Sequence, residues 1–211
     1  MSRSVALYFL DLRTAPPSLQ DRLSADEQQR AAALADPLVR RQWTLGRAWL
    51  RRLLSERLGR PAASFAFGRG PHGKPFVVDA PGFGFSLSHA GSMLACAMGD
   101  DAQLGVDIEP LDRQLAPADH WWRVLPAHEL RVVGRSRRRF LQAWVRKESI
   151  LKAEGTGLGY GSADAARWRL ASGSTRGHCW SLACRGPARE LQLIETEFEA
   201  ARRTRRMPLP A

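Results

Sequence analysis

The hydrophobic and polar positions of this chain change period several times, which predicts a mixture of strands and helices. Apolar residues fill positions 5–12 almost continuously and predict a first strand. They then recur every three or four positions over 37–58, where Asp36-Pro37 and Gly59 supply the start and the end of a long helix. The same helical spacing over 137–154 predicts a second long helix.

Shorter alternating segments predict further strands around these two helices. The expected strands cover residues 64–67, 76–78, 83–88, 93–98, 104–109, 166–171, 179–185 and 191–199. Two more helical segments are expected, one that follows the capping box from Ser24 to Glu27 and ends near Ala35, and one over 119–133.

The order of these elements predicts the fold class α+β, with helices segregated against antiparallel sheets. We expect two similar halves that form a pseudo-dimer, residues 1–102 and 103–200, each a helix-backed antiparallel sheet. A cleft between the halves is the expected place for an active site. Residues 201–211 have no helix or strand pattern and are expected to form a frayed basic tail.

Composition narrows the class of protein. With 211 residues, 44% of them hydrophobic, the chain can build a globular core. No apolar stretch approaches the ~20 residues of a membrane helix, and the N-terminal apolar run is shorter than that of a signal peptide, so we expect a cytoplasmic protein without membrane partners. Cys96, Cys179 and Cys184 lack the spacing of zinc ligands or redox pairs and are expected to be reduced core thiols, with no disulfide or zinc.

Charge points to the kind of ligand. The formal net charge of +11 favours anionic partners such as nucleic acid, acidic proteins or polyphosphates. All but three of the 32 basic residues are arginine, and the three lysines are Lys74, Lys147 and Lys152. Two of these lysines flank Glu148, which predicts sites that need a compact ammonium group.

Three acidic side chains stand out in this basic chain. Asp107 and Glu109 are two residues apart on an expected strand, so their carboxylates point to the same side about 6.5–7 Å apart. Glu148 lies on the second long helix. Oxygen ligands of this kind select Mg²⁺ or Mn²⁺, ions that are often shared with a substrate phosphate. A plainer interpretation stays open, namely a solvated strand face and an ordinary ion pair between Glu148 and Lys152.

Two glycine-containing segments are candidates for binding an anion. Ser88-His89-Ala90-Gly91 ends an expected strand, where small residues let backbone amides approach a phosphate. A catalytic Ser-His dyad is not expected there, because adjacent residues on a strand face opposite sides. The segment from Arg69 to Pro75 is a glycine-rich turn of a kind that normally just connects two strands.

Together these segments resemble the signature blocks of the larger, surfactin-synthetase type of 4′-phosphopantetheinyl transferases. The blocks are residues 86–91, 105–109 and 144–158, with weaker ones at 45–51 and 73–75. The resemblance implies a monomer of two α+β halves with coenzyme A bound between them. It also implies Mg²⁺-dependent transfer of the 4′-phosphopantetheine group to a serine of an apo acyl or peptidyl carrier protein, with release of 3′,5′-ADP.

The resemblance also implies roles for individual residues. Asp107, Glu109 and Glu148 match the acids that bind Mg²⁺, and Lys152 matches a lysine that faces the coenzyme diphosphate. Glu148 and Lys152 are therefore the expected catalytic residues, with either Glu148 or a water accepting the serine proton. The implied coenzyme A-binding residues are Arg30, Arg51, Arg69, Gly73, Lys74, Pro75, Ser88, His89, Asp107 and Lys152.

Two other functions are compatible with acids on a basic chain. A Mg²⁺-dependent nuclease usually has a lysine two residues after the second acid, where this chain has Leu111. A nucleic-acid-binding module could use Trp121-Trp122 to stack bases, although tryptophans beside helix-spaced apolar residues are usually core. The resemblance implies no nucleic-acid partner, and it leaves open whether the carrier serves fatty-acid, polyketide or nonribosomal-peptide synthesis.

Overall fold

The computed structural model describes residues 4–100, 103–156, 164–185, 190–196 and 203–209. Its helices and 3-10 turns are η1 (Pro17–Arg22), α1 (Ala25–Ala32), α2 (Pro37–Leu58), η2 (Ala62–Ser64), η3 (Ala118–Arg123), α3 (Ala127–Val133), α4 (Arg137–Glu154) and η4 (Ala165–Arg167). Its strands are β1 (Ser4–Asp11), β2 (Phe67–Arg69), β3 (Pro75–Val77), β4 (Phe83–Ala90), β5 (Met93–Asp100), β6 (Gln103–Pro110), β7 (Arg169–Thr175), β8 (His178–Arg185), β9 (Glu190–Thr196) and β10 (Arg203–Pro208). The predicted α+β class is confirmed.

The two long helices have the ends that the sequence predicted. The Asp36 carboxylate accepts hydrogen bonds from the backbone N–H groups of Leu38 and Val39 and so caps α2. Helix α2 ends at Gly59 and α4 ends at Gly155, each in the left-handed conformation that glycine adopts without a steric penalty. These local signals place α4, which carries Glu148 and Lys152, at the predicted residues.

Three segments differ from the predicted elements. Residues 62–64 form a 3-10 turn, so strand β2 begins only at Phe67. The strand expected from residue 166 begins at Arg169, because the Asp164 carboxylate caps the turn η4 at the backbone N–H of Ala166. The helical segment expected over 119–133 is divided into η3 and α3, where Pro126 precedes the first residue of α3.

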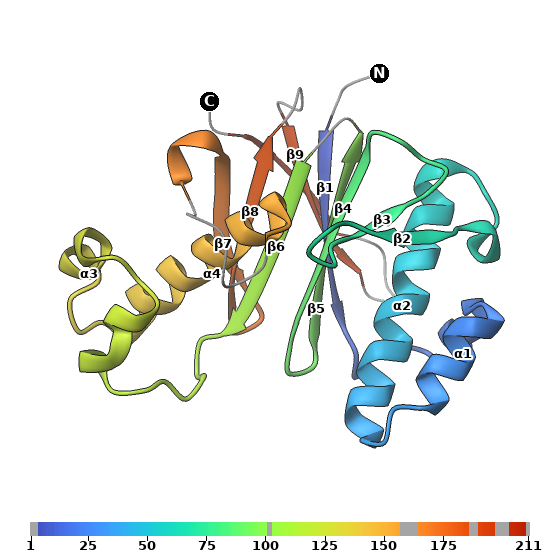
Figure 1. The fold of residues 1–211 in the computed structure, drawn as a ribbon, viewed down its shortest axis with the longest axis horizontal. Helices are drawn as coiled ribbons and strands as arrows, with labels where there is room; N and C mark the ends of the chain where they lie inside the picture. The colour runs from blue at the N-terminus through green and yellow to red at the C-terminus, as the bar shows by residue number, and fades with distance from the viewer. Residues whose placement is uncertain (1–3, 101–102, 157–163, 186–189, 197–202, 210–211) are drawn as a thin grey trace.

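The strands form two sheets and a short hairpin. The five-stranded sheet has the order β10-β9-β1-β5-β4, the three-stranded sheet has the order β6-β8-β7, and β2 pairs with β3 alone. Helix α2 packs against the first sheet and α4 against the second, on opposite sides of the molecule (Figure 1). Strands β4 and β6 lie side by side where the sheets meet. The description of the halves as a pseudo-dimer remains a prediction.

Strand β9 corrects the expectation that each half holds only antiparallel strands. It lies within the expected second half but pairs with β1 of the first half, and it does so in parallel. The burial of β1 explains this pairing, because every residue from Ser4 to Asp11 is buried and its second edge needs a hydrogen-bonded partner. The residues of β1 point alternately toward α2, as Tyr8 does, and toward the second sheet, as Phe9 does.

The C-terminal segment also differs from the sequence-based expectation. Residues 203–208 form strand β10, which pairs antiparallel with β9, so the expectation of a frayed tail is wrong for this part of 201–211. Met207 and Leu209 pack against the core between the sheets, which explains why the segment is held in place. The ends of that range, 201–202 and 210–211, lie outside the described residues.

The remaining expectations about the core concern tryptophan and cysteine. Trp121 is buried and stacks on Phe140 with ring centroids 4.3 Å apart, so it is a core residue and not an exposed stacking platform. The side chain of Trp122 lies outside the described residues. Cys96, Cys179 and Cys184 are free and buried. Among the described helices, none combines the length and apolar character needed to span a bilayer.

Candidate active site

The two acids of β6 share one face of the strand, as their spacing predicted, and the structure packs this face against α4. Val106 and Ile108 point to the core between the sheets, so Asp107 and Glu109 point to the other face. The Asp107 side chain is almost fully buried, and Glu109 is half-buried. A carboxylate as buried as that of Asp107 needs charged or hydrogen-bonding partners close by.

Gly105 lets α4 approach β6 closely enough to supply such partners. A Cβ atom at this position would lie 2.0 Å from the Ser149 carbonyl oxygen and 2.3 Å from the Ala153 backbone nitrogen. Only a residue without a side chain permits this contact between strand and helix. The contact places Glu148 and Lys152, on either side of Ser149, over the acid-bearing face of β6.

Lys152, Asp107 and Ser88 form a hydrogen-bonded triangle. The Lys152 ammonium donates to Asp107 Oδ1 at 2.6 Å and contacts Ser88 Oγ at 2.8 Å, while Ser88 Oγ donates to Asp107 Oδ1 at 2.8 Å. These residues come from α4, β6 and β4, so the triangle lies where the two sheets meet. The structure thus joins a predicted catalytic residue to two of the predicted coenzyme-binding residues.

Two buried carboxylate oxygens beside this triangle have no hydrogen-bond partner among the described residues. They are Asp107 Oδ2 and Glu148 Oε1. Burial and the repulsion from Asp107 raise the pKa of Glu148 to about 7. Unpartnered acceptors and mutual repulsion are what a cation between two carboxylates would relieve.

The third predicted metal ligand has another partner. The Glu109 carboxylate forms an ion pair with the Arg113 guanidinium, four residues along the chain. Burial, opposed by Arg113, raises the pKa of Glu109 above its ordinary value. Among the described residues, no three acid, histidine or cysteine side chains gather closely enough to hold a metal ion. The assignment of Asp107, Glu109 and Glu148 as a ligand set therefore stays a prediction.

An arginine-lined cavity lies next to this site, between α1, α2 and the β2–β3 hairpin. Its volume is about 480 Å³, and its wall includes Arg30, Arg47, Arg51 and Arg69. Glu27 holds two of these arginines, with Arg51 Nε at 2.6 Å and Arg47 Nε at 3.3 Å from its carboxylate oxygens. The concentration of positive charge in one cavity makes it suited to a phosphate group.

The arginines of this cavity are oriented differently. Arg51 is buried and also donates from Nη1 to the Ala62 carbonyl oxygen at 2.6 Å, so its guanidinium is occupied by the protein. The Arg47 guanidinium carbon lies 4.3 Å from the Phe67 ring centroid, and its buried Nη1 has no hydrogen-bond partner among the described residues. Burial lowers the pKa of Arg47. Arg47 thus keeps one guanidinium N–H group for which the described residues supply no acceptor.

The sequence reasoning did not single out Arg47. The signal was its position four residues before Arg51, which places both arginines on one face of α2. A second signal, the acidic partner Glu27, could not be paired with either arginine before the fold was known. The Arg47 side chain is held by contacts from three separate elements, α1, α2 and β2.

Two further cavities adjoin the arginine-lined one. The first, about 390 Å³, lies between the hairpin and α4 and shares Pro75 with it. The second, about 270 Å³, lies between α2 and β4 and shares Trp43 and Arg47 with it. The predicted coenzyme-binding and catalytic residues that line these two cavities are Gly73, Lys74, Pro75, Ser88, His89, Glu148 and Lys152. The last residues of the 144–158 block, Gly157 and Leu158, lie outside the described residues.

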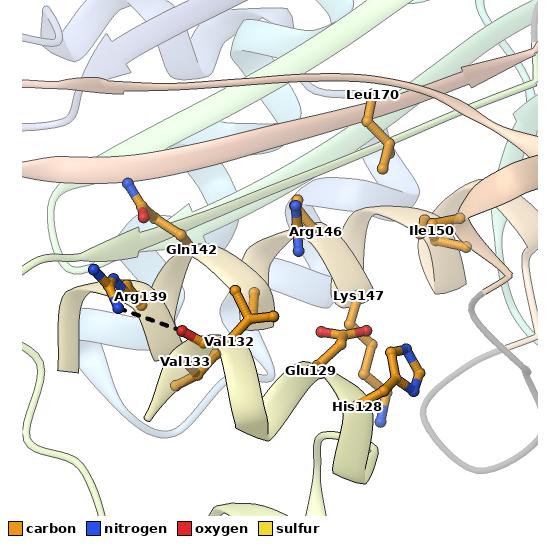
Figure 2. Close-up of a pocket in the computed structure, with 12 residues that line it drawn as sticks. His128, Glu129, Val132, Val133, Arg139, Gln142, Arg146, Lys147, Ile150 and Leu170 are labelled. Carbon is orange, nitrogen blue, oxygen red and sulfur yellow. Dashed lines mark hydrogen bonds between the residues drawn. The ribbon is translucent and has the colours of Figure 1, made fainter. Parts of the chain in front are cut away.

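A fourth cavity, of about 450 Å³, lies between α3, α4 and the segment around Leu170 (Figure 2). Its wall includes Arg146 and Ile150 of α4, which lie on the side of the helix away from Glu148. Figure 2 shows Arg139 directed to the backbone of Val132, where the guanidinium donates at 3.4 Å. We call Asp107, Glu148 and Lys152, together with Ser88, the acid-lysine cluster. The body of α4 separates the fourth cavity from this cluster.

Sequence comparisons agree with the geometry. Residues 103–200 match the profile of the 4′-phosphopantetheinyl transferase superfamily. The chain is 31% identical over 175 residues to the 4′-phosphopantetheinyl transferase HetI of a Nostoc species, a match that covers 75% of this chain and 71% of HetI. It is 33% identical over 126 residues to the transferase psf-1 of Bacillus pumilus, covering 57% and 53%, and 29% identical over 119 residues to the transferase Sfp of Bacillus subtilis, covering 54% and 52%.

The extent of these matches differs between relatives. The match spans about half the length of psf-1 and of Sfp, and about seven tenths of HetI. The profile covers the segment that carries Asp107, Glu109, Glu148 and Lys152. Because the match to HetI is 31% identical and covers 71% of that protein, and the profile match agrees with it, the chain belongs to the 4′-phosphopantetheinyl transferase superfamily.

Proposed function

We propose that this protein transfers the 4′-phosphopantetheine group of coenzyme A to a serine of an apo acyl or peptidyl carrier protein and releases 3′,5′-ADP. The observation that carries the proposal is the Lys152–Asp107–Ser88 triangle, with Glu148 beside it, at the edge of a cavity that adjoins the arginine-lined one. The arginine-lined cavity offers fixed positive charge. The region around Lys152 combines an ammonium group with unpartnered carboxylate oxygens of Asp107 and Glu148. A ligand with a terminal phosphate and a reacting diphosphate uses both.

The cavities indicate how coenzyme A would lie. The arginine-lined cavity suits the 3′-phosphate, with Arg47 and Arg30 as the residues whose side chains can donate to it. Gly73 and Pro75 of the hairpin then form the wall beside the adenosine. The diphosphate would lie near the Lys152 ammonium, whose charge offsets the charge that develops on the leaving group.

The donor set fits a divalent ion with oxygen ligands. Asp107 Oδ2 and Glu148 Oε1 are buried and unpartnered, and carboxylate oxygens are the ligands that Mg²⁺ prefers. Asp107 and Glu148 would hold the ion, joined by Glu109 if its carboxylate leaves Arg113. When bound, Mg²⁺ or Mn²⁺ would neutralise charge on the diphosphate.

The residues of the chain have separate tasks in the proposed transfer. The carrier serine oxygen forms a bond to the β-phosphorus of coenzyme A, and the bond from that phosphorus to the oxygen of the 3′,5′-ADP group breaks. The serine proton goes to Glu148, either directly or through a water molecule, because this residue lines the cavity and one of its carboxylate oxygens has no partner among the described residues. Lys152 holds the diphosphate, and Ser88 and Asp107 hold Lys152 in place.

The carrier protein is the second proposed partner. Exposed arginines gather on α3 and α4 and in the segments around them, namely Arg113, Arg131, Arg135, Arg137, Arg138, Arg139 and Arg146. Such a surface attracts an acidic protein at long range, and salt weakens the attraction beyond ~8 Å at physiological ionic strength. We therefore propose that the carrier presents an acidic surface to this half of the molecule.

The decisive experiment measures the mass of the product. The purified protein is mixed with coenzyme A, Mg²⁺ and a panel of apo carriers from fatty-acid, polyketide and nonribosomal-peptide synthesis. Gain of one phosphopantetheine group on at least one carrier, lost in EDTA and restored by Mg²⁺ or Mn²⁺, is the expected result. No gain on any carrier, together with cleavage or tight salt-sensitive binding of nucleic acid, would instead support the nuclease or nucleic-acid-binding alternative.

A further inference from the structure

Lys74 connects the β2–β3 hairpin to two elements of the second half. Its ammonium donates to the Leu104 carbonyl oxygen at 2.9 Å and to the Ala153 carbonyl oxygen at 2.8 Å. The first acceptor belongs to β6 and the second to the last turn of α4. Within the part of the chain that the structure describes, the hairpin strands pair only with each other, so this side chain supplies a polar link from the hairpin to the second sheet and its helix.

The bond to Ala153 caps α4. The last four carbonyl groups of an α-helix have no partner within the helix, and the partial negative charge there favours a cation. Gly155 donates its backbone N–H to Leu151, which leaves the Ala153 carbonyl for the Lys74 ammonium. The cap lies one residue beyond Lys152, so it fixes the turn of α4 that carries the catalytic lysine.

The bond to Leu104 contributes to holding the free edge of β6. Of the described strands, β8 alone pairs with β6, so the other edge of β6 lies beside β4 and the hairpin. Ser86 Oγ of β4 accepts the Val106 backbone N–H at 3.1 Å on that edge. Side chains from the first half thus supply partners to backbone groups of the strand that carries Asp107.

The stem of Lys74 is held as closely as its ammonium. A Cβ atom at Gly155 would lie 3.1 Å from Lys74 Cδ and 3.4 Å from Lys74 Cβ, so the stem packs directly over this glycine. Burial lowers the pKa of Lys74 to about 8. Because a neutral amine retains two N–H donors, both carbonyl bonds are available in either protonation state.

We propose that Lys74 is a positioning residue, which docks the coenzyme-binding hairpin on the end of α4 and the edge of β6 and so assembles the groove between them. The inference rests on the proposed function for the role of the groove, but not for the contacts. Both acceptors of the Lys74 ammonium are protein carbonyls, whereas the neighbouring Gly73 and Pro75 line the cavity that also holds Glu148 and Lys152. Lys74 therefore sets the distance between two walls of one cavity.

Hydrogen exchange of the protein without coenzyme A tests this docking. Lys74→Met keeps most of the stem and removes both donors, and we expect amides of residues 67–77 and the last turn of α4 to exchange about tenfold faster. Lys147→Met is the matched control, because Lys147 also donates to a carbonyl oxygen, that of Val124, at 2.6 Å but far from the hairpin. The control should leave exchange of 67–77 unchanged.

Kinetics separate a positioning role from direct contact with the coenzyme. Lys74→Met should raise the KM for coenzyme A and lower kcat, each about tenfold. The reason is that the hairpin and the turn of α4 that carries Lys152 are then no longer held at a fixed distance from each other. Lys74→Gln, which retains a donor, should restore part of both. If Lys74→Met left hairpin exchange at the wild-type rate and changed only the KM for coenzyme A, Lys74 would be a ligand of the coenzyme and the inference would be wrong.

The exchange result bears on the role of Lys74 even if transfer is not observed. The exchange experiment needs neither substrate nor metal, so it tests the docking when the proposed activity fails. If Lys74→Met does not fold, the same exchange measurement on Lys74→Ala, which also removes both donors, decides the matter. Unchanged protection of 67–77 in a folded variant that has no donor at position 74 would overturn the inference.

Discussion

The two charged regions of the site are built in opposite ways. In the arginine-lined cavity the protein itself holds the arginines, because Glu27 binds Arg47 and Arg51, and Arg51 is also held by a backbone carbonyl. Positive charge stays in excess there, because the wall also contains Arg30 and Arg69. At the acid-lysine cluster the charges are not balanced, because Asp107 and Glu148 each keep an unpartnered buried oxygen beside one lysine. The first region is ready for an anion, and the second suits a cation such as the proposed Mg²⁺.

This difference predicts which kinetic constant each region controls. Arginines that hold a remote phosphate stabilise the bound substrate and the transition state equally, so their loss raises KM. Groups beside the reacting diphosphate act mainly in the transition state, so their loss lowers kcat. The following substitutions test the comparison, beginning with the largest expected effect.

Asp107→Ala should break the acid-lysine cluster most completely. The substitution removes the acceptor of Lys152 and Ser88 and one of the two free carboxylate oxygens, and kcat should fall on the order of 10³-fold. Mass spectrometry of a carrier measures the rate. Asp112→Ala, at an exposed aspartate five residues away, should keep the wild-type rate. A folded Asp107→Ala protein that kept most of its activity would show that the cluster is not the reaction centre.

Lys152→Met should have the next largest effect. It removes the ammonium that bridges Asp107 and Ser88, and kcat should fall about a hundredfold as the diphosphate loses its cation. The KM for coenzyme A should change much less. A fall confined to KM would move Lys152 from the reacting diphosphate to general binding and weaken the contrast between the two regions.

Gly105→Ala tests whether the approach of α4 to β6 creates the cluster. The new Cβ would lie 2.0 Å from the Ser149 carbonyl oxygen, so the helix must shift. We expect a loss of about 1–3 kcal/mol in the free energy of unfolding, measured with urea, and a lower kcat in the folded protein. In Gly46→Ala the new Cβ would meet Leu94 at an ordinary 3.6 Å, so this variant should not lose stability.

Arg47→Ala should act on the other region. Loss of its free donor should raise the KM for coenzyme A about tenfold with kcat nearly unchanged, the scale of one charge-assisted hydrogen bond. The increase should be much smaller with 3′-dephospho-coenzyme A, which lacks the phosphate assigned to this cavity. Equal increases for both substrates would remove the phosphate assignment of Arg47.

The smallest expected effect is on the pH dependence of the free energy of unfolding. It depends on Lys74, which lines the cavity that adjoins the arginine-lined one. Above about pH 8 the folded protein releases the proton of Lys74, while the unfolded chain keeps it up to about 10.5. The unfolded state then binds more protons, so the free energy of unfolding gains a contribution that rises with pH across this window. Urea unfolding at several pH values should show this rise in the wild type but not in Lys74→Met. Identical pH slopes would show that the pKa of Lys74 is not lowered by folding.

Local sequence signals predicted some contacts that the fold then used. Asp36, Gly59 and Gly155 gave the ends of the two long helices, because caps act within one or two turns of the chain. The Asp-x-Glu alternation on β6 placed Asp107 and Glu109 on the face opposite Val106 and Ile108, because the period of a strand is two. The signal at Pro126 was present but was not recognised as a break between η3 and α3.

Contacts between distant residues could not be predicted in the same way. Glu27 meets Arg51 across 24 positions, and Lys74 meets Ala153 across 79. The parallel pairing of β9 with β1 joins the last part of the chain to its first strand. Such pairings depend on which surfaces are left uncovered after the sheets and helices have packed.

The sequence by itself determined the helix ends, the alternation of the strands and the residue types of the site, because these depend on neighbours within a few positions. Only the tertiary structure decided that Lys152 reaches Asp107 and Ser88, and that Arg47 keeps a donor without an acceptor among the described residues. The physical reason is that burial and repulsion between charges arise when separate elements meet. These are the forces that raise the pKa of Glu148, and no local pattern contains them.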